Sequence, residues 1–332
     1  SMIRIGRSAG TVLVALTVAF AAPRARAGGE NVARWKTVEI AVPPEDADEA
    51  VLGRPASLAL AADRIYIADS QDCAIKVFSK DGKFVLSFGR RGRGPGELSF
   101  PSGVAVAGDR VYVADKLNRR IQVFDPDGGF RGGFTLTVAP DKVFALASGA
   151  LIVTTNPTGR GPGEKLLRLL EADGRPRWEG LEARVSTDPV FDSFRNMILV
   201  CPGEEGGFIV VHRSGERSLL RFGGDGALLG EVPVDGRHAF TPMDIPFKGP
   251  VKRLLGFCWA AARDRGLLYL AAPEAVDGRD LGPGRRLSVV DGTGRLRAVV
   301  ELARPVHRFA VDGDRIVAID GEGALCLFEV VR

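Results

Sequence analysis

The chain has 332 residues, of which 45% are hydrophobic and 26% are charged. A chain of this length and apolar content can bury one large core or two ordinary ones, and it has no low-complexity tract that would indicate disorder. Its formal net charge is only +4, and the excess of basic residues lies in the first 27 positions.

Residues 1–27 have the features of a secretory signal peptide. Two arginines precede an apolar run at residues 11–22, and the sequence Ala-Arg-Ala follows at residues 25–27. The run is too short to span a bilayer comfortably, and small residues of this kind mark a cleavage site. We therefore predict cleavage after Ala27 and a periplasmic or extracellular protein. The alternative interpretation is a buried amphipathic helix.

The mature chain is expected to be neutral and without a membrane span. Removal of the leader takes away four arginines and no acidic residue, which leaves 41 basic and 41 acidic residues. A nucleic-acid partner would normally require a net positive field, so we expect none. Residue 28 is Gly and not the Cys of a lipid anchor. Ser1, ahead of Met2, is interpreted as a residue left by cloning.

Two segments match column by column and define a repeat. RIYIADSQDCAIKVFSKDGKFVLSF at residues 64–88 aligns with RVYVADKLNRRIQVFDPDGGFRGGF at residues 110–134. Each copy follows an apolar run and contains two alternating strands, an Asp-Gly pair and a further strand. This pattern predicts four antiparallel strands in roughly 45 residues, which is the size of one β-propeller blade.

An Asp-Gly pair follows the third strand in five copies of the repeat. A two-residue hairpin turn needs positive φ at its central residues, which Asp tolerates and Gly prefers. We therefore expect a two-residue turn at each pair. The pairs begin at Asp81, Asp127, Asp173, Asp225 and Asp291.

The last copy, residues 307–330, has only three strands, and residues 32–42 form an alternating strand without another partner. We predict an all-β fold: a six-bladed β-propeller of four-stranded antiparallel blades, closed by this N-terminal strand so that no sheet edge is left between the first and last blades. The predicted propeller covers residues 28–332, with blades at residues 55–100, 101–140, 141–193, 194–250, 251–304, and 305–330 completed by 32–42.

The segment PSGVAVAGDRVYVADKLNRRIQVF at residues 101–124 resembles an NHL repeat. It runs from a Pro-led inner strand through Tyr-Val-Ala-Asp to Asn, Arg and a Val-Phe strand. Blade one shares part of the pattern, and the later blades share less. The resemblance implies an NHL-like or TolB-like six-bladed propeller used for binding, with lactonases and lyases among similar scaffolds.

The sequence GRRGRGPGE at residues 89–97 is predicted to connect blades one and two. A similar loop, TGRGPGEK, lies at residues 158–165 of blade three. Glu97 and Leu98 follow the last Gly, where a phosphate-binding P-loop needs Lys and Ser or Thr. Either the loop orders itself against the next blade, or it contacts a partner or an anionic ligand. The candidate arginines for such contact are Arg90, Arg91, Arg93 and Arg160.

These loops belong to the face that carries the longer connecting segments, because strand two-to-three loops and blade connectors emerge on the same side of a propeller. Long loops are where scaffolds place function. The predicted segments are residues 89–100, 156–165, 184–195, 235–256 and 273–286.

The starts of the innermost strands should surround the mouth of the central channel. Alignment of the Gly-Asp pairs of blades two and six places Ala56, Ser102, Lys142 and His307 in one column, with approximate positions for blades four and five. The candidate ligand-binding residues of the mouth are Lys142, Arg195 (or its neighbour Asn196), Trp259 and His307. Trp259 could instead belong to the core, and His307 could be a satisfied polar residue.

No catalytic residue, metal ligand or cofactor is assigned. Only His307 is expected at the mouth, so the three-histidine zinc site of propeller lyases is not expected. Lys142 and Arg195 would repel the calcium ion of a lactonase-type site. Asp69, Asp115 and Asp320 end second strands, where we expect them to accept hydrogen bonds from loop amides.

The four cysteines are widely spaced, and we expect buried free thiols, with Cys201 and Cys258 as the first candidates if a bridge exists. The four are Cys73, Cys201, Cys258 and Cys326.

Taken together, these patterns favour a secreted or periplasmic binding scaffold. Its loop-rich face would bind a protein, a peptide or a small anionic ligand. The alternative is a propeller enzyme of the lactonase or lyase type, with its site at the channel mouth.

Overall fold

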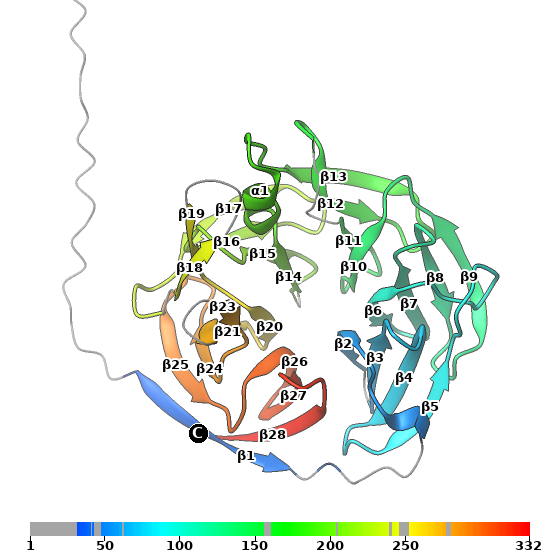
Figure 1. Cartoon of the computed structure of the whole chain (residues 1–332), viewed down its shortest axis with the longest axis horizontal. Helices are drawn as coiled ribbons and strands as arrows, with labels where there is room; N and C mark the ends of the chain where they lie inside the picture. The colour runs from blue at the N-terminus through cyan, green and yellow to red at the C-terminus, as the bar shows by residue number, and fades with distance from the viewer. Residues whose placement is uncertain are drawn as a thin grey trace, which may run out of the picture. The chain divides into compact units, whose positions relative to one another are not determined.

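The six blades form a ring in the computed structural model of the chain (Figure 1). The structure describes residues 32–40, 42, 48–61, 63–155, 161–203, 205–238, 241–245, 252–276 and 280–332. The predicted signal peptide and Arg160 lie outside the described residues. Within the described part of the chain, no helix is long and apolar enough to cross a membrane.

Blades one to three are regular four-stranded antiparallel sheets. Blade one follows the short 3-10 helix η1 (Asp48–Ala50). Its strands are β2 (Pro55–Leu60), β3 (Arg64–Asp69), β4 (Ala74–Ser79) and β5 (Phe84–Phe88). Blade two consists of β6 (Pro101–Ala107), β7 (Arg110–Asp115), β8 (Arg120–Phe124) and β9 (Phe130–Thr135). Blade three consists of β10 (Pro140–Ala145), β11 (Leu151–Thr155), β12 (Lys165–Leu170) and β13 (Pro176–Glu182).

Blades four to six follow the same order, from the inner strand outward. Blade four consists of β14 (Ile198–Pro202), β15 (Phe208–His212), β16 (Ser218–Phe222) and β17 (Leu228–Pro233). Blade five consists of β20 (Ala260–Asp264), β21 (Leu267–Ala271), β24 (Arg286–Val290) and β25 (Leu296–Glu301). Blade six consists of β26 (Val306–Asp312), β27 (Arg315–Asp320), β28 (Leu325–Val331) and β1 (Ala33–Ile40).

The core lies between the blades, because each sheet packs a face against its neighbour. Tyr66 and Ile75 of blade one belong to the same buried cluster as Val104, Val113 and Phe124 of blade two. The second strands β3 and β7 are therefore almost fully buried, whereas the outer strand β17 alternates between exposed and half-buried residues. A single blade cannot bury both of its faces, so the ring is stable only as a whole.

The hairpins between third and fourth strands are three-residue loops and not the expected two-residue turns. In blade one, Ser79 O accepts a hydrogen bond from Gly82 N, and Ser79 N donates to Lys83 O. Of the three loop residues, only Gly82 has positive φ, at 83°. The pairing of β4 with β5 then shifts register between Val77 and Phe78. This is a turn followed by a glycine bulge, which leaves the Asp in an ordinary conformation.

The same glycines hold neighbouring blades together. A Cβ added to Gly128 would lie 2.6 Å from the Cβ of Phe88 in the preceding blade. Gly174 contacts Phe134 and Gly226 contacts Trp178 in the same way. The repeated glycine therefore serves both the turn and the contact between sheets.

Strand β1 closes the ring, as the sequence predicts. It pairs antiparallel with β28, with Lys36 opposite Val331 and Ile40 opposite Leu327. It also pairs in parallel with β25 of blade five, from Ala33 opposite Ala298 to Lys36 opposite Glu301. This second pairing was not anticipated, and it joins blades five and six into one eight-stranded sheet.

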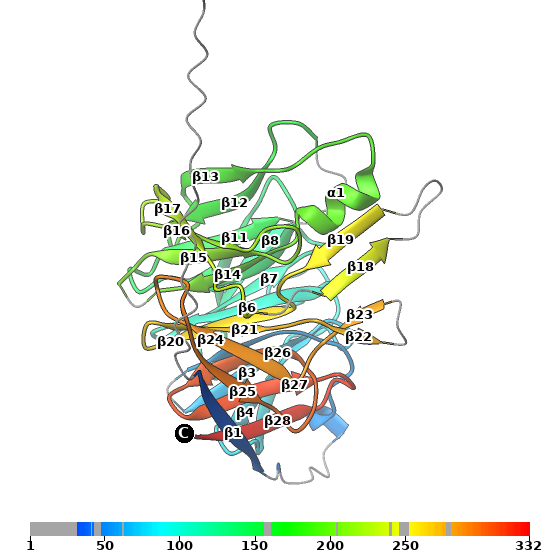
Figure 2. The same ribbon diagram turned by 90° about the vertical axis from the view of Figure 1, so that its left-hand side faces the viewer.

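The longer insertions project from one face of the ring (Figure 2). Helix α1 (Pro189–Arg195) begins at Asp188, whose carboxylate accepts hydrogen bonds from the amides of Val190 and Phe191. The hairpin of β18 (Thr241–Ile245) and β19 (Lys252–Gly256) lies on the same side, as does the hairpin of β22 (Glu274–Val276) and β23 (Asp280–Gly282).

Deletion of residues 32–40 tests the role of closure. Loss of β1 leaves β25 and β28 with unpaired backbone groups, so the variant should aggregate or melt about 10 °C or more below the parent protein. The control is a circular permutant that places residues 32–42 after Arg332 through a Gly-Ser linker, which the antiparallel pairing permits and which should melt like the parent. Unchanged melting of the deletion variant would contradict the assignment of β1 as the closing strand.

Candidate functional site

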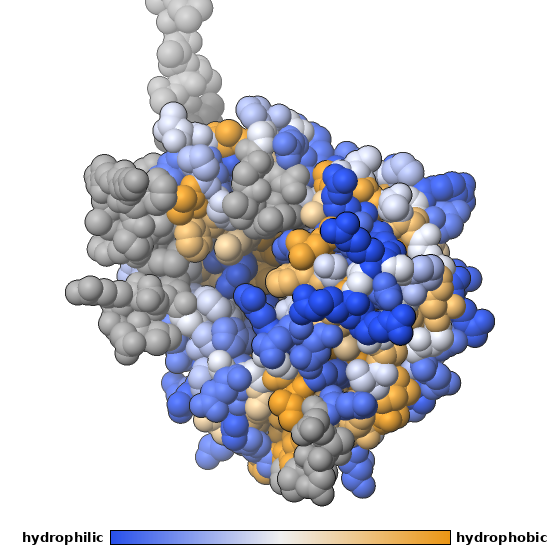
Figure 3. Space-filling view, turned by 45° about the vertical axis from the view of Figure 1, so that its right-hand side comes forward, coloured by the Kyte–Doolittle hydropathy of each residue, from blue (hydrophilic) through white to orange (hydrophobic). Residues whose placement is uncertain are grey.

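A cavity of about 420 Å³ lies among the inner strands at the middle of the ring. Residues of blades one, three, four, five and six line it, including Ala56, Lys142, Arg213, Trp259 and Arg308. Figure 3 shows the ring hollowed near its middle, with hydrophilic side chains beside the hollow. The size lies within the range of small-molecule sites.

A β-bulge at the start of four inner strands decides which side chains enter this cavity. The register shifts between Pro55 and Ser57, between Pro101 and Gly103, between Pro140 and Lys142, and between Val306 and Arg308. The extra residue at each bulge is Ala56, Ser102, Asp141 and His307. Because two residues oppose one across a bulge, a bulged residue and its successor can both face the channel.

This register corrects the predicted column in blade three. Asp141, and not Lys142, is the counterpart of His307, and Lys142 is the counterpart of Arg308. Both members of each pair nevertheless line the cavity. Lys142 and His307 are therefore at the channel, as expected, and Arg308 and Asp141 join them.

Lys142 spans the channel toward blades one and two. Its Nζ donates hydrogen bonds to Ser102 O at 2.6 Å and to Ala56 O at 3.2 Å. These carbonyls are dipoles and do not neutralise its charge. The pKa of Lys142 is lowered to about 8, and burial is the largest cause. The charge of Asp141 raises this pKa, whereas the charges of Arg308, Lys116 and Arg213 lower it.

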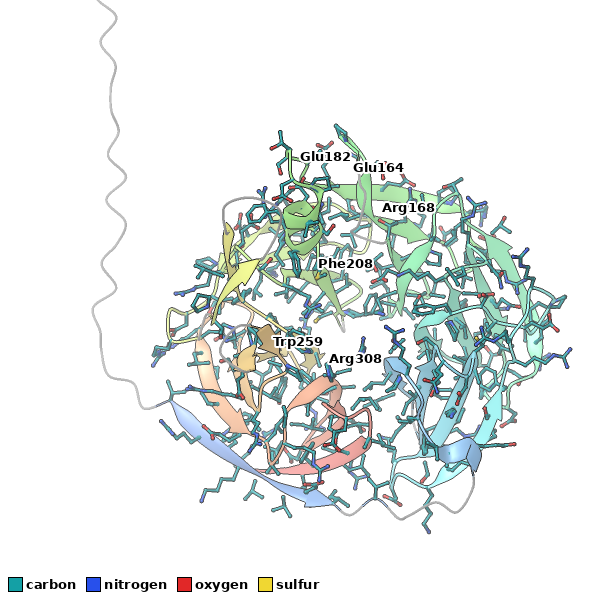
Figure 4. The ribbon with its side chains drawn as sticks, in the orientation of Figure 1. Glu164, Arg168, Glu182, Phe208, Trp259 and Arg308 are labelled. Carbon is teal, nitrogen blue, oxygen red and sulfur yellow. The ribbon has the colours of Figure 1, made fainter. Side chains whose placement is uncertain are left out.

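Arg308 and Arg213 supply two further cations to the same cavity. Figure 4 shows Arg308 and Trp259 toward the middle of the ring. Burial lowers the pKa of both guanidiniums, and the charge of Arg308 also lowers that of Arg213. The Arg213 guanidinium lies 4.5 Å from the ring centroid of Trp259, a favourable cation–π contact. Among the described residues, we find no hydrogen-bond or ion-pair partner for the Arg308 side chain.

His307 and Trp259 form a pair on the wall between blades five and six. Trp259 Nε1 donates a hydrogen bond to His307 Nδ1 at 3.3 Å. Burial lowers the pKa of His307, and the charges of Arg308 and Arg213 lower it further. The imidazole is therefore neutral at neutral pH, and because Nδ1 accepts, its proton lies on Nε2. His307 is a polar residue with a partner, and Trp259 lines the channel while also packing against the core cluster of blades five and six.

The carboxylate in the cavity does not balance these charges. Asp141 accepts a hydrogen bond from Lys116 Nζ at 2.8 Å. Burial raises the pKa of Asp141, but the charges of Lys142 and Lys116 outweigh this effect and hold it below its ordinary value. Lys116 thus pairs with the acid, and Lys142, Arg213 and Arg308 leave the channel positively charged.

The other predicted binding residues lie elsewhere. Arg195, on α1, contacts Asp192 and stacks on Phe191 and does not line the cavity, whereas its neighbour Asn196 does. The arginines of the crossing between blades one and two are also outside the lining: Arg90, Arg91 and Arg93.

The crossing loop is ordered by its own glutamate. The Glu97 carboxylate accepts hydrogen bonds from the amides of Arg93 and Gly94 and from the Arg90 guanidinium. Blade two holds the loop in turn, because Arg120 donates to the carbonyls of Gly94 and Glu97. The Arg90 side chain remains 81% exposed. These contacts favour the self-ordered interpretation, and a binding role for the exposed arginines stays a prediction.

The carboxylates at the ends of second strands hold loops, as expected. Asp69 accepts from the amides of Gly53, Arg54, Gln71 and Asp72. Asp115 accepts from Ser99 N and pairs with Arg120 at 2.8 Å. Asp320 accepts from the amides of Glu322 and Ala324 and pairs with Arg304.

The remaining histidines and the thiols lie away from the channel. His212 is buried beside Glu216, and His238 Nε2 is hydrogen-bonded to Phe257 O at 2.7 Å. The four cysteines are free and buried, and burial raises the pKa of Cys201 to about 12. In the described part of the chain, no three His, Cys, Asp or Glu side chains gather as a metal site.

Known proteins share the fold of this chain. Residues 42–159 match a family described as a six-bladed β-propeller. None of the curated proteins matches the sequence. A Bacteroides fragilis protein described as exported has 12% identity and a TM-score of 0.57 over 90% of this chain and 95% of its own.

Enzymes are among the similar solved structures. A gluconolactonase of Xanthomonas campestris has 17% identity and a TM-score of 0.53, with 84% of this chain and 87% of that chain covered. A streptogramin B lyase has 10% identity and a TM-score of 0.50, with 90% and 98% covered. At these identities the likeness shows the propeller fold alone.

Replacement of Lys142 by Met tests whether its ammonium is buried at a cost. Below pH 8 both the folded and the unfolded chain carry the charge, and the folded state bears its full burial cost. Between about pH 8 and the ordinary lysine value of 10.5, the folded state loses its proton first, so this cost falls as pH rises. Lys142→Met should therefore raise the free energy of unfolding at pH 7 by about 2 kcal/mol.

The measurement is urea unfolding of both proteins at pH 7 and pH 10. The difference in the free energy of unfolding between Lys142→Met and the parent should be smaller at pH 10 than at pH 7. The variant also loses the contacts of Lys142 with the carbonyls, which changes the free energy of unfolding by the same amount at both pH values. The change of the difference with pH is therefore the decisive quantity. A difference that stays constant with pH would show that Lys142 is not buried at a cost.

Proposed function

We propose that this β-propeller is an exported binding protein that holds a small anionic ligand in its central channel. The single observation that carries the proposal is the Arg308 guanidinium, which is half-buried in the cavity and has no hydrogen-bond or ion-pair partner among the described residues. Asp141 interacts with it only at longer range, and Lys142 and Arg213 line the same cavity. Burial lowers the pKa of all three cations, and the charge of Arg308 lowers the pKa of Lys142 and Arg213 further, so the cations are not arranged for stability. An anion would stabilise all three.

The chemistry of the donors fits a carboxylate, sulfate or phosphate group. Two guanidiniums can each donate two parallel hydrogen bonds to such a group, and the ammonium adds a point charge. The neutral His307 adds no free donor, because it accepts from Trp259 Nε1 and is also hydrogen-bonded to the backbone of Gly321. A cavity of about 420 Å³ leaves room for more than the anionic group itself.

The proposal includes the NHL-like character of the blades and a binding role for the loop-rich face. What supports the first is the repeat at residues 101–124. What supports the second is that α1 and the hairpins of β18–β19 and β22–β23 project from one face of the ring. In this proposal the insertions control access to the channel.

Equilibrium dialysis with radiolabelled sulfate tests whether the channel binds an anion. The parent protein should bind one sulfate per chain, and Arg308→Gln should weaken binding about 10-fold or more, since a charge-assisted hydrogen bond to a desolvated ion is lost. The matched control is Arg93→Gln, which removes the same charge from the exposed crossing loop and should leave the affinity nearly unchanged. A parent protein that binds neither sulfate nor acetate would refute the proposal.

The two variants also locate the site. If Arg93→Gln weakens binding as much as Arg308→Gln, the anion binds at the arginine-rich loop and the channel assignment is wrong. Melting temperatures of both variants that are no lower than that of the parent would show that the loss is one of binding and not of folding.

Export is proposed from the leader sequence, which lies outside the described residues. The chain expressed in a bacterium with its leader intact should be recovered from the periplasm or medium, with an N-terminal sequence that begins at Gly28. The direct measurements are N-terminal sequencing and intact mass. A protein retained in the cytoplasm at full length would contradict the proposed leader.

A further inference from the structure

A second, smaller cavity adjoins the channel. Its volume is about 160 Å³, and it lies between the end of α1, the segment after β15 and the start of blade five. The side chains that form its walls include Phe194, Met197, Arg213, Ser214, Cys258 and Trp259.

The polar atoms of this small cavity are already engaged. Ser214 Oγ donates to Phe194 O at 3.1 Å, and Cys258 Sγ donates to Ala260 O at 3.0 Å. The apolar walls that remain are the rings of Phe194, Trp259 and Pro273 and the thioether of Met197. A space lined in this way favours an apolar occupant, and thioether–aromatic contacts are favourable.

The two cavities share a border. Met197, Arg213 and Trp259 line both of them. The Arg213 guanidinium, held over the ring of Trp259 with Nη1 3.7 Å from Met197 Sδ, therefore stands where the apolar space meets the cationic channel. A molecule that spans this border would have a negative group on one side and an apolar group on the other.

We propose that the channel ligand is an organic anion that carries one six-membered apolar ring, with the anionic group among Lys142, Arg213 and Arg308 and the ring in the small cavity. An apolar cavity of about 150 Å³ is enough to hold a benzene molecule, and the volume here is about 160 Å³. The inference rests on the proposed anion site and adds the class of ligand: an arylalkanoate or a related ring-bearing acid.

The test compares acetate, phenylacetate and phenylpropionate by isothermal titration calorimetry at equal ionic strength. The better of the two ring-bearing acids should bind about 10-fold or more tighter than acetate, because it buries a phenyl ring. Benzyl alcohol, which has the ring without the charge, should bind more weakly than either ring-bearing acid. If acetate and sulfate both fail to bind, the anion site itself is wrong. If acetate binds and the ring adds nothing, the anion site stands and the ring site is wrong.

A paired substitution on α1 locates the ring. Phe194→Trp places a larger side chain in the wall of the small cavity and so reduces its volume. It should abolish the higher affinity of the ring-bearing acid while leaving the affinity for acetate unchanged. Phe191→Trp makes the same change on the same helix at a residue outside the cavity lining, and it should alter neither affinity. A ring advantage that survives in folded Phe194→Trp would overturn the proposal.

Methyl NMR of the unmodified protein keeps the test independent of any variant. The chain has three methionines, and Met197 is the methionine that lines the cavity among the described residues. Its methyl signal, assigned with Met197→Leu, should move upfield on addition of phenylacetate, and acetate, which has no ring, should cause no such upfield shift. A Met197 signal unchanged at saturating phenylacetate would also overturn the proposal.

Discussion

The hydrogen bonds of β1 are the constraint on which the rest of the structure depends. Each blade covers only its neighbours, so an open array would end in two exposed faces and an unpaired edge. Strand β1 removes that edge by lying between β28 and β25, and it ties the first described strand of the chain to the last. A closed ring in turn brings the starts of the inner strands together. That is how Ala56, Lys142 and Arg308, which are far apart in sequence, come to border one cavity.

The same convergence has an energetic cost. Burial lowers the pKa of Lys142, Arg213 and Arg308, and the charge of Arg308 lowers the pKa of the other two further, so the cations destabilise the protein when nothing occupies the channel. The carbonyls of Ala56 and Ser102 and the face of Trp259 offset part of that cost. Charges that weaken a fold are characteristic of functional sites, because a ligand of opposite charge recovers the lost free energy on binding.

Most of the fold could be predicted from the sequence because its signals are local. Alternating strands, an Asp-Gly pair and a missing last strand lie within single repeats, and they were sufficient for six blades and the closing strand. The turn type was wrong because the bulge residue of each hairpin is chosen by sheet twist and by contact with the preceding blade, as at Gly128 and Phe88. The parallel pairing of β1 with β25 has no signal in either segment alone.

The site was only partly predictable, and the reason is again the bulge. Column alignment found Lys142, Trp259 and His307, but strict alternation would turn the successor of His307 away from the mouth, so Arg308 was missed. Arg213 follows a second strand and belonged to no column at all. The bulge presents pairs of neighbours, Asp141 with Lys142 and His307 with Arg308. In blade three, Lys116 of blade two pairs with Asp141, and this leaves Lys142 unbalanced. The sign of the channel is thus set by contacts between blades, which become visible only once the ring is closed.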